Sequence, residues 1–233
     1  MCIAVYKPMG EQFPSKTTFK TMFANNPDGC GFMFADGQKV VIKKGFMSFG
    51  GFWKAFRPYR DQTDRAFVFH FRIATHGGIN RAMCQPFPYT DSVRELKRLD
   101  TRAPLGIAHN GIIPMTTDAR KISDTALFIK KYLTRIVRTP HNIKPVDLDI
   151  IDACIDSKMI LLQPDGHAYL IGKFTNDNGV YYSNASYKYK YTYSFKKPYS
   201  YDLDSYNDEY WKLYGYNSYE EYIADLEYYD NFV

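Results

Sequence analysis

The second residue of the chain is a cysteine, and its position gives the thiol a specific chemical possibility. If Met1 is trimmed, Cys2 becomes the N-terminal residue and its α-amine has a pKa of ~7.7–8. Such an amine is partly neutral at pH 7, so it can accept the thiol proton and return it to a leaving group. The alternative is a small residue at the start of a buried strand. The position of Cys2 alone does not decide between these interpretations.

A second motif places an arginine at the end of a strongly apolar segment. Residues 66–78, "AFVFHFRIATHGG", indicate a buried strand that ends in two glycines. Arg72, Thr75 and His76 stand at the end of this strand. A guanidinium at a strand end can bind a carboxylate through two hydrogen bonds. The alternative is an arginine in a surface salt bridge.

Two shorter motifs complete the set. "AHNGII" places Asn110 and Gly111 at the end of another buried strand, where a side-chain amide and a backbone N–H can hold an oxyanion. "ISDTALF" places Asp124 at a helix start, where it can stabilise the helix or receive an ammonium group. The alternative for Asn-Gly is a simple turn. Together, however, thiol, oxyanion donors, guanidinium and carboxylate complement an α-amino acid with a side-chain amide.

The same motifs carry a family resemblance. The chain resembles the glutaminase domain of the class II glutamine amidotransferases, the N-terminal-cysteine branch of the N-terminal nucleophile (Ntn) hydrolases. The matching segments stand in family order over roughly residues 2–190: Met-Cys-Ile, "NPDGCGF", "FRIATHG", "AHNGII", "SDT" and "GVYYSNASY". Two positions depart from the family pattern, since Gln85 stands where many members have His and Ala126 where Glu is common.

The resemblance implies a fold and a reaction. The fold would be of the α+β class, a four-layer αββα sandwich, and the reaction would be hydrolysis of glutamine to glutamate and ammonia. Cys2 would attack the side-chain amide and form a γ-glutamyl thioester. Asn110 and Gly111 would hold the tetrahedral oxyanion. No metal ion and no organic cofactor would be required.

The resemblance also implies how glutamine is bound. Arg72, helped by Thr75 and His76, would bind the α-carboxylate, and Asp124 would bind the α-ammonium. Family members usually carry a synthase domain that uses the ammonia, and 233 residues leave no room for one. We therefore expect a stand-alone glutaminase that supplies a separate acceptor enzyme.

Two other functions stay open at this point. The same site could act as a hydrolase or transferase on another γ-glutamyl amide. The chain could also be a non-catalytic Ntn scaffold that binds a protein or nucleic acid. Turnover of glutamine compared with larger γ-glutamyl amides distinguishes the first alternative, and biological activity without the Cys2 thiol would favour the second.

The hydrophobic pattern predicts interleaved strands and helices. Ser15, Asp91 or Ser92, and Ser123 are the predicted N-caps. Strands are expected within 2–7, 66–78, 103–113, 158–174 and 179–195, with a hairpin at 30–45. Helices are expected within 14–29, 50–59, 89–100, 122–137 and 146–156.

The C-terminal end differs in composition from the rest. Residues 199–233 carry nine acids and one base, within a chain of net charge +5, so the remainder is basic. We predict an Ntn domain over 2–195 and an acidic, tyrosine-rich tail over 196–233 with two short helices. The tail could be a docking surface or could pack on its own core. The basic body could bind nucleic acid, or the tail could neutralise it.

The composition and the cysteine spacing indicate in which cellular compartment the protein resides. Hydrophobic residues make up 45% of the chain, and no segment approaches the ~18 consecutive apolar residues of a membrane span. The N-terminus lacks the apolar core of a secretory signal. The four cysteines are widely spaced, which argues against a disulfide framework or a zinc site. We therefore predict a cytoplasmic protein with reduced thiols and no membrane contact.

Overall fold

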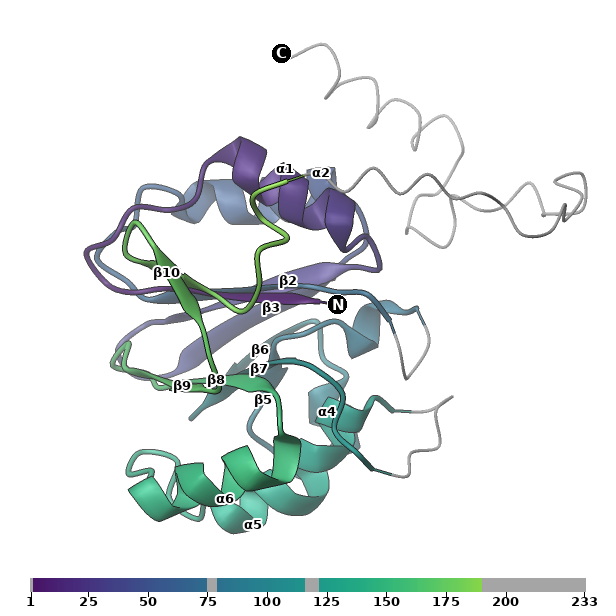
Figure 1. Cartoon of the computed structure of the whole chain (residues 1–233), viewed down its shortest axis with the longest axis vertical. Coiled ribbons are helices and arrows are strands. Elements are labelled where there is room, and N and C mark those ends of the chain that lie inside the picture. The colour runs from purple at the N-terminus through teal and green to yellow at the C-terminus, as the bar shows by residue number, and fades with distance from the viewer. Residues whose placement is uncertain (1, 75–78, 116–121, 190–233) are drawn as a thin grey trace, which may run out of the picture.

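The computed structural model describes residues 2–74, 79–115 and 122–189. Two antiparallel β-sheets form the centre of the molecule (Figure 1). The larger sheet has seven strands in the spatial order β10 (Thr175–Asp177), β11 (Val180–Tyr182), β1 (Ile3–Lys7), β4 (Phe67–Phe71), β2 (Cys30–Ala35), β3 (Val40–Phe46) and β6 (Asp100–Ala103). The smaller sheet has four strands in the order β5 (Phe87–Pro88), β7 (Gly106–Asn110), β8 (Lys158–Leu162) and β9 (Ala168–Ile171). The predicted mixed α+β class is confirmed.

Helices α1 (Lys16–Asn25) and α2 (Phe49–Phe56) cover one face of the larger sheet (Figure 1). Alternate residues of its strands point to this face, and many of them are phenylalanines. The Phe19 ring of α1 lies 4.8 Å from the Phe69 ring of β4, measured between centroids. The Ser15 side chain accepts a hydrogen bond from the Thr18 backbone N–H at 3.0 Å, which confirms the predicted N-cap.

A second, largely aliphatic core lies between the two sheets. The facing sides of both sheets supply it. Its members include Ala4 from β1 and Val68 from β4 in the larger sheet and Ile160 from β8 in the smaller sheet. The sheets approach closely at Gly106, where an added Cβ would stand 2.2 Å from the sulfur of Met33. Glycine is therefore required at this point of β7.

The outer face of the smaller sheet packs against the remaining longer helices. α4 (Asp124–Phe128) and α6 (Pro145–Ile155) contribute Phe128, Ile151 and Ile155 to this third core. The single helix predicted over 122–137 begins as expected, with Ser123 as its N-cap. It is not continuous, however, because a π-helical turn over Ile129–Leu133 separates α4 from α5 (Thr134–Ile136). The wider π turn changes the helical register, and Tyr132 within it is 48% exposed.

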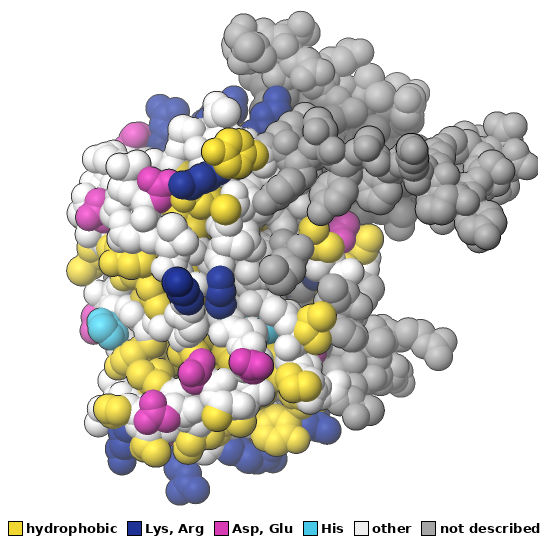
Figure 2. Space-filling view, viewed as in Figure 1, with side chains coloured by type: hydrophobic (Ala, Val, Ile, Leu, Met, Phe, Trp, Pro, Cys, Tyr) yellow, Lys and Arg dark blue, Asp and Glu magenta, His cyan; other side chains and the backbone are white. Residues whose placement is uncertain are grey.

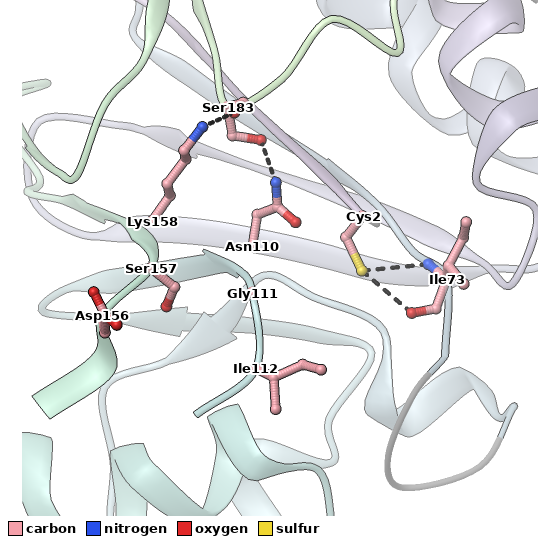
Figure 3. A pocket seen from close by; sticks show the side chains of 9 residues that line it. All are labelled: Cys2, Ile73, Asn110, Gly111, Ile112, Asp156, Ser157, Lys158 and Ser183. Carbon is pink, nitrogen blue, oxygen red and sulfur yellow. Dashed lines mark hydrogen bonds between the residues drawn. The ribbon is translucent and has the colours of Figure 1, made fainter. Parts of the chain in front are cut away.

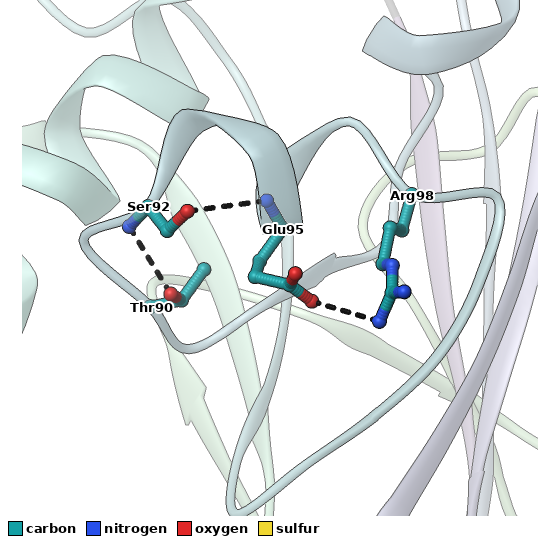
Figure 4. Close-up of polar contacts among 4 residues, drawn as sticks. All are labelled: Thr90, Ser92, Glu95 and Arg98. Atoms are coloured by element: carbon teal, nitrogen blue, oxygen red, sulfur yellow. Dashed lines mark hydrogen bonds and ion pairs between the residues drawn. The ribbon is translucent and has the colours of Figure 1, made fainter.

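Helix α3 (Val93–Leu96) is a single turn held by local contacts (Figure 4). Of the two predicted caps, Ser92 takes the role, and its hydroxyl accepts a hydrogen bond from the Glu95 N–H at 3.4 Å. The Thr90 hydroxyl in turn accepts from the Ser92 N–H at 3.1 Å. Glu95 also pairs with Arg98 at 3.2 Å on the exposed surface. The turn is therefore stabilised without a large apolar face.

Three further features concern the surface charge, the length of the helices and the cysteines. On the face shown in Figure 2, Lys and Arg side chains lie at the top, at the bottom and near the centre, with acidic side chains interspersed among them. None of the helices in the described ranges has the length and hydropathy needed to cross a membrane. All four cysteines are free thiols. The predicted tail over 196–233 lies outside the described residues.

Candidate functional site

Polar side chains replace apolar ones at one end of the space between the sheets. On β1 the residues that share a face run Tyr6, Ala4 and then Cys2, because side chains alternate along a strand. On β4 the equivalent series passes from Val68 through His70 to Arg72. β1 and β4 are antiparallel with Ile3 opposite Phe71, so Cys2 and Arg72 follow at the same end.

The smaller sheet repeats this change on its inner face. On β7 the series passes from Ala108 to Asn110, and on β8 it passes back from Ile160 to Lys158. The register pairs Asn110 with Lys158 across the two strands. Beyond β11, Ser183 joins them, since its N–H donates to the Ala4 carbonyl at 2.9 Å. Both sheets thus present polar side chains at one end of their interface.

The Cys2 thiol is half-buried and held by the backbone after β4. Its Sγ lies 3.3 Å from both the carbonyl oxygen and the amide nitrogen of Ile73. The Asn184 side-chain amide donates to the Cys2 carbonyl at 2.6 Å and positions the Cys2 backbone. Burial raises the pKa of the Cys2 thiol, although the Ile73 N–H and the Arg72 charge oppose the increase. A reaction at this thiol therefore needs a base.

A cavity of about 380 Å³ opens on one side of Cys2 (Figure 3). The Asn110 Nδ2 donates one hydrogen to the Ser183 hydroxyl at 2.8 Å, which leaves its second N–H for another acceptor. Gly111 lies so close to Ser157 that an added Cβ would be 2.4 Å from the Ser157 Cβ. Cys2 comes from the larger sheet, whereas Asn110 and Gly111 come from the smaller one. The cavity is lined by Cys2, Ile73, Asn110, Gly111, Ile112, Asp156, Ser157, Lys158 and Ser183.

A smaller cavity of about 20 Å³ also touches Cys2 and brings opposite charges together. Arg72 and Asp124, the two buried charged residues of its wall, are 4% and 6% exposed. The Asp124 carboxylate accepts hydrogen bonds from the Ile113 N–H at 2.9 Å and the Thr125 N–H at 2.7 Å. These bonds fix the carboxylate in place and leave further lone pairs for a ligand. The wall comprises Cys2, Arg72, Ile73, Met83, Gln85, His109, Gly111, Ser123, Asp124 and Thr125.

His109 lies in the wall of the smaller cavity and is held in a neutral form. Its Nε2 lies 2.7 Å from the Ser157 hydroxyl and its Nδ1 lies 3.0 Å from the Thr125 hydroxyl. The Ser157 hydroxyl already donates to the Ile155 carbonyl, so the proton of the imidazole belongs on Nε2. Burial lowers the pKa of His109 to about 4. The ring is thus a neutral positioning group at physiological pH.

Gln85, one of the two departures from the family pattern, has a local role here. Its side-chain oxygen accepts a hydrogen bond from the His109 backbone N–H at 2.7 Å. Its amide nitrogen lies 3.5 Å from the Thr125 hydroxyl. Gln85 therefore connects β7 to the start of α4, the two segments that carry Asn110 and Asp124.

The structure brings together most of the predicted site. Four of the five described members line a cavity together with the fifth, Cys2, whereas Thr75 and His76 fall outside the described residues. The structure adds polar wall residues that the motifs did not single out: Gln85, His109, Ser157, Lys158 and Ser183. The sequence could have indicated Lys158 as a candidate, because this residue begins an apolar strand and lies on the same face of that strand as Ile160. Nothing in the sequence, however, indicated that this strand pairs with the one carrying Asn110.

No protein-family model matches the sequence, and no curated protein is significantly similar to it. Among residues 2–74, 79–115 and 122–189, no three His, Cys, Asp or Glu side chains are grouped to hold a metal ion. The two cavities at Cys2 are therefore the features from which a function can be inferred.

Proposed function

We propose that this chain is a glutaminase of the class II amidotransferase type, which hydrolyses glutamine to glutamate and ammonia. One observation carries the proposal: a single thiol borders both a buried Arg72–Asp124 pair and a pair of oxyanion donors. The fold we propose is the αββα sandwich of Ntn hydrolases. The order of the three cores supports it, with helices outside each sheet and an aliphatic core between the sheets.

The smaller cavity would recognise the amino acid end of glutamine. Arg72 would bind the α-carboxylate through charge-assisted hydrogen bonds, with Thr75 and His76 completing that side. Asp124 would bind the α-ammonium, and its hydrogen bonds from the backbone hold it ready to do so. A ligand with both a carboxylate and an ammonium complements both charges, whereas a simple carboxylate or a simple amine complements only one of them.

The larger cavity would hold the reacting amide. Cys2 Sγ would attack the side-chain amide carbon (Cδ) of glutamine, and the Asn110 amide and Gly111 N–H would receive the oxygen as it becomes an oxyanion. Burial raises the pKa of the thiol, so its proton must pass to a base. The free α-amine of Cys2 would take this proton and transfer it to the departing ammonia. This step requires cleavage of the peptide bond before Cys2.

Hydrolysis of the thioester would complete the cycle. Water would attack the thioester carbonyl carbon, the same donors would hold the second oxyanion, and the carbon–sulfur bond would break to release glutamate. The ammonia would then serve a separate acceptor enzyme. We place this activity in the cytoplasm, where the four free thiols stay reduced.

An intact-mass measurement with a glutamine-analogue diazoketone tests the proposal. We expect loss of Met1 and one adduct on Cys2, with labelling prevented by excess glutamine. Cys154→Ser is a matched control, because Cys154 is an exposed thiol that lines neither cavity, and this variant should label normally. Cys2→Ala should not label. A processed protein that reacts at Cys154 instead, or that glutamine does not protect, would contradict the proposal.

A further inference from the structure

The larger cavity exceeds what the release of ammonia requires. Its volume of about 380 Å³ lies within the range of about 300–1,000 Å³ typical of small-molecule sites. Ammonia is similar in size to water, which takes up about 30 Å³ in the liquid. The two cavities share Cys2, Ile73 and Gly111 but otherwise have different walls. The smaller cavity, at about 20 Å³, holds little more than one water, so a γ-glutamyl group bound at Arg72 and Asp124 must extend into the larger cavity, which still has room for a leaving group larger than ammonia.

The walls of the larger cavity indicate the chemistry of that group. Ile73 and Ile112 present apolar surface, and Ile112 is 56% exposed. Lys158 adds a positive charge, and its ammonium donates to the Ser183 carbonyl (Figure 3). An ammonium has three hydrogens, so two remain for a ligand. Within the described part of the chain, no carboxylate lies at ion-pair distance from Lys158.

Asp156 is the one acidic side chain of this wall, and its location limits its influence. It is exposed and ends α6 in a left-handed conformation with φ of 42°. Figure 3 shows its side chain directed away from the Lys158 ammonium, which points toward Ser183. A ligand carboxylate at Lys158 would therefore meet the cation rather than the Asp156 carboxylate.

We propose that the larger cavity binds the amine portion of γ-glutamyl amides of apolar amino acids, with the carboxylate of that portion at Lys158. This inference rests on the proposed γ-glutamyl thioester chemistry at Cys2. Attack by Sγ forms the carbon–sulfur bond and breaks the amide carbon–nitrogen bond. The thiol proton reaches the departing amino acid through the Cys2 α-amine. Water then cleaves the thioester to glutamate.

The test compares three substrates with the processed full-length protein: glutamine, γ-glutamyl-leucine and γ-glutamyl-leucinamide, which lacks the terminal carboxylate. We expect γ-glutamyl-leucine to reach a kcat/KM at least equal to that of glutamine. The leucinamide compound should be poorer by about 10-fold, the value of one charge-assisted hydrogen bond. Because this comparison uses the unaltered protein, it does not depend on a variant that folds.

Lys158→Met then assigns the effect to one side chain. The kcat/KM ratio of γ-glutamyl-leucine to glutamine should fall by about 10-fold, while the ratio for the leucinamide compound should not change. Lys131→Met is the matched control, since Lys131 is exposed and is not part of the cavity lining, and it should alter neither ratio. Equal effects of Lys158→Met on all three substrates would overturn the assignment.

The outcomes separate this inference from the proposed function. Turnover of glutamine with γ-glutamyl-leucine slower by more than about 100-fold would overturn the leaving-group site and leave the glutaminase proposal standing. Equal kcat/KM values for γ-glutamyl-leucine and its leucinamide would overturn the role of Lys158 as carboxylate partner. Absence of turnover with every substrate, together with an unlabelled Cys2, would contradict the proposed function itself.

Discussion

The two ends of the space between the sheets are built on the same strands but have opposite chemistry. At one end Ala4, Val68 and Ile160 belong to a largely aliphatic core, to which Tyr6 adds a buried hydroxyl. At the other end the next positions on those strands bring Cys2, His70 and Lys158, beside the buried Arg72 and Asp124. Burial of such groups costs free energy, whereas an aliphatic core would have stabilised the same sheets. The difference supports the chemistry proposed for the polar end.

The comparison also shows how the fold supplies a site without altering its strands. The side-chain alternation continues unbroken along β1, β4, β7 and β8, and only the residue types change near their ends. The aliphatic end therefore anchors the geometry of the polar end. This contrast predicts that changes at the polar end alter catalysis most, and that changes at the aliphatic end alter stability most.

Removal of the oxyanion donor at the polar end should have the largest effect. Asn110→Ala should lower kcat for glutamine by about 10²–10³-fold, because the transition state loses a hydrogen bond that the ground state does not require. Ammonia release at saturating glutamine measures the change. Ser183→Ala removes only the hydroxyl that holds the Asn110 amide, so it should lower kcat by a smaller factor. A less than fivefold loss in Asn110→Ala would mean that the polar end is not an oxyanion site.

Shortening a side chain at the aliphatic end should lower the stability of the fold and leave kcat nearly unchanged. Ile160 is fully buried, so Ile160→Ala should lower the free energy of unfolding by about 2–5 kcal/mol through lost burial and a cavity. Ile160→Val should cost about 0.5–1.5 kcal/mol. Urea titrations measure both values, and kcat measured below the unfolding transition should stay near that of the parent. A large loss of kcat in a folded Ile160→Ala protein would show that the two ends are not separable.

The buried histidines of the polar end should make stability depend on pH. Burial lowers the pKa of His70 to about 3 and that of His109 to about 4, below about 6.5 in the unfolded chain. Between about pH 3 and about pH 6.5 the unfolded state therefore binds more protons than the folded state. Stability from the neutral rings is complete above about pH 6.5 and falls with decreasing pH, by up to about 1.4 kcal/mol per unit for each histidine.

Urea titrations at pH 7 and pH 5 measure this slope. His70→Gln should reduce it, because one of the two protonation sites is removed while a side-chain N–H can still donate toward the His109 carbonyl. His167→Gln is the control, since the His167 side chain is exposed. An unchanged slope in His70→Gln would show that the acid sensitivity of the fold has another origin.

The smallest effects should lie outside both ends, at the surface turn of α3. Ser92→Ala removes the N-cap and should cost about 1 kcal/mol of stability. Arg98→Ala removes only an exposed ion pair with Glu95 and should cost less than about 0.5 kcal/mol. Neither change should alter kcat. A cost of Arg98→Ala larger than that of Ser92→Ala would contradict the assignment of the cap as the stabilising contact.

Much of the local structure was predictable because short-range rules govern it. Ser15 and Ser123 cap their helices as predicted, since an N-cap needs only its hydroxyl and the N–H groups that follow. The hairpin of β2 and β3 was predictable from Asp36, whose carboxylate accepts from two backbone N–H groups of the turn. The helix over 122–137 was predicted in one piece, because local propensity does not show a π-helical turn.

The sequence by itself determined the identity of the reactive groups, their places at strand and helix ends, and the alternation that gives each strand an inner face. These properties depend on side-chain chemistry and on backbone geometry over a few residues. Only the tertiary structure decided which ends meet. The pairing of Asn110 with Lys158 and of Ala4 with Ser183 joins residues far apart in the chain. The two cavities around Cys2 exist because that register is chosen by packing of whole sheets, which no local segment encodes.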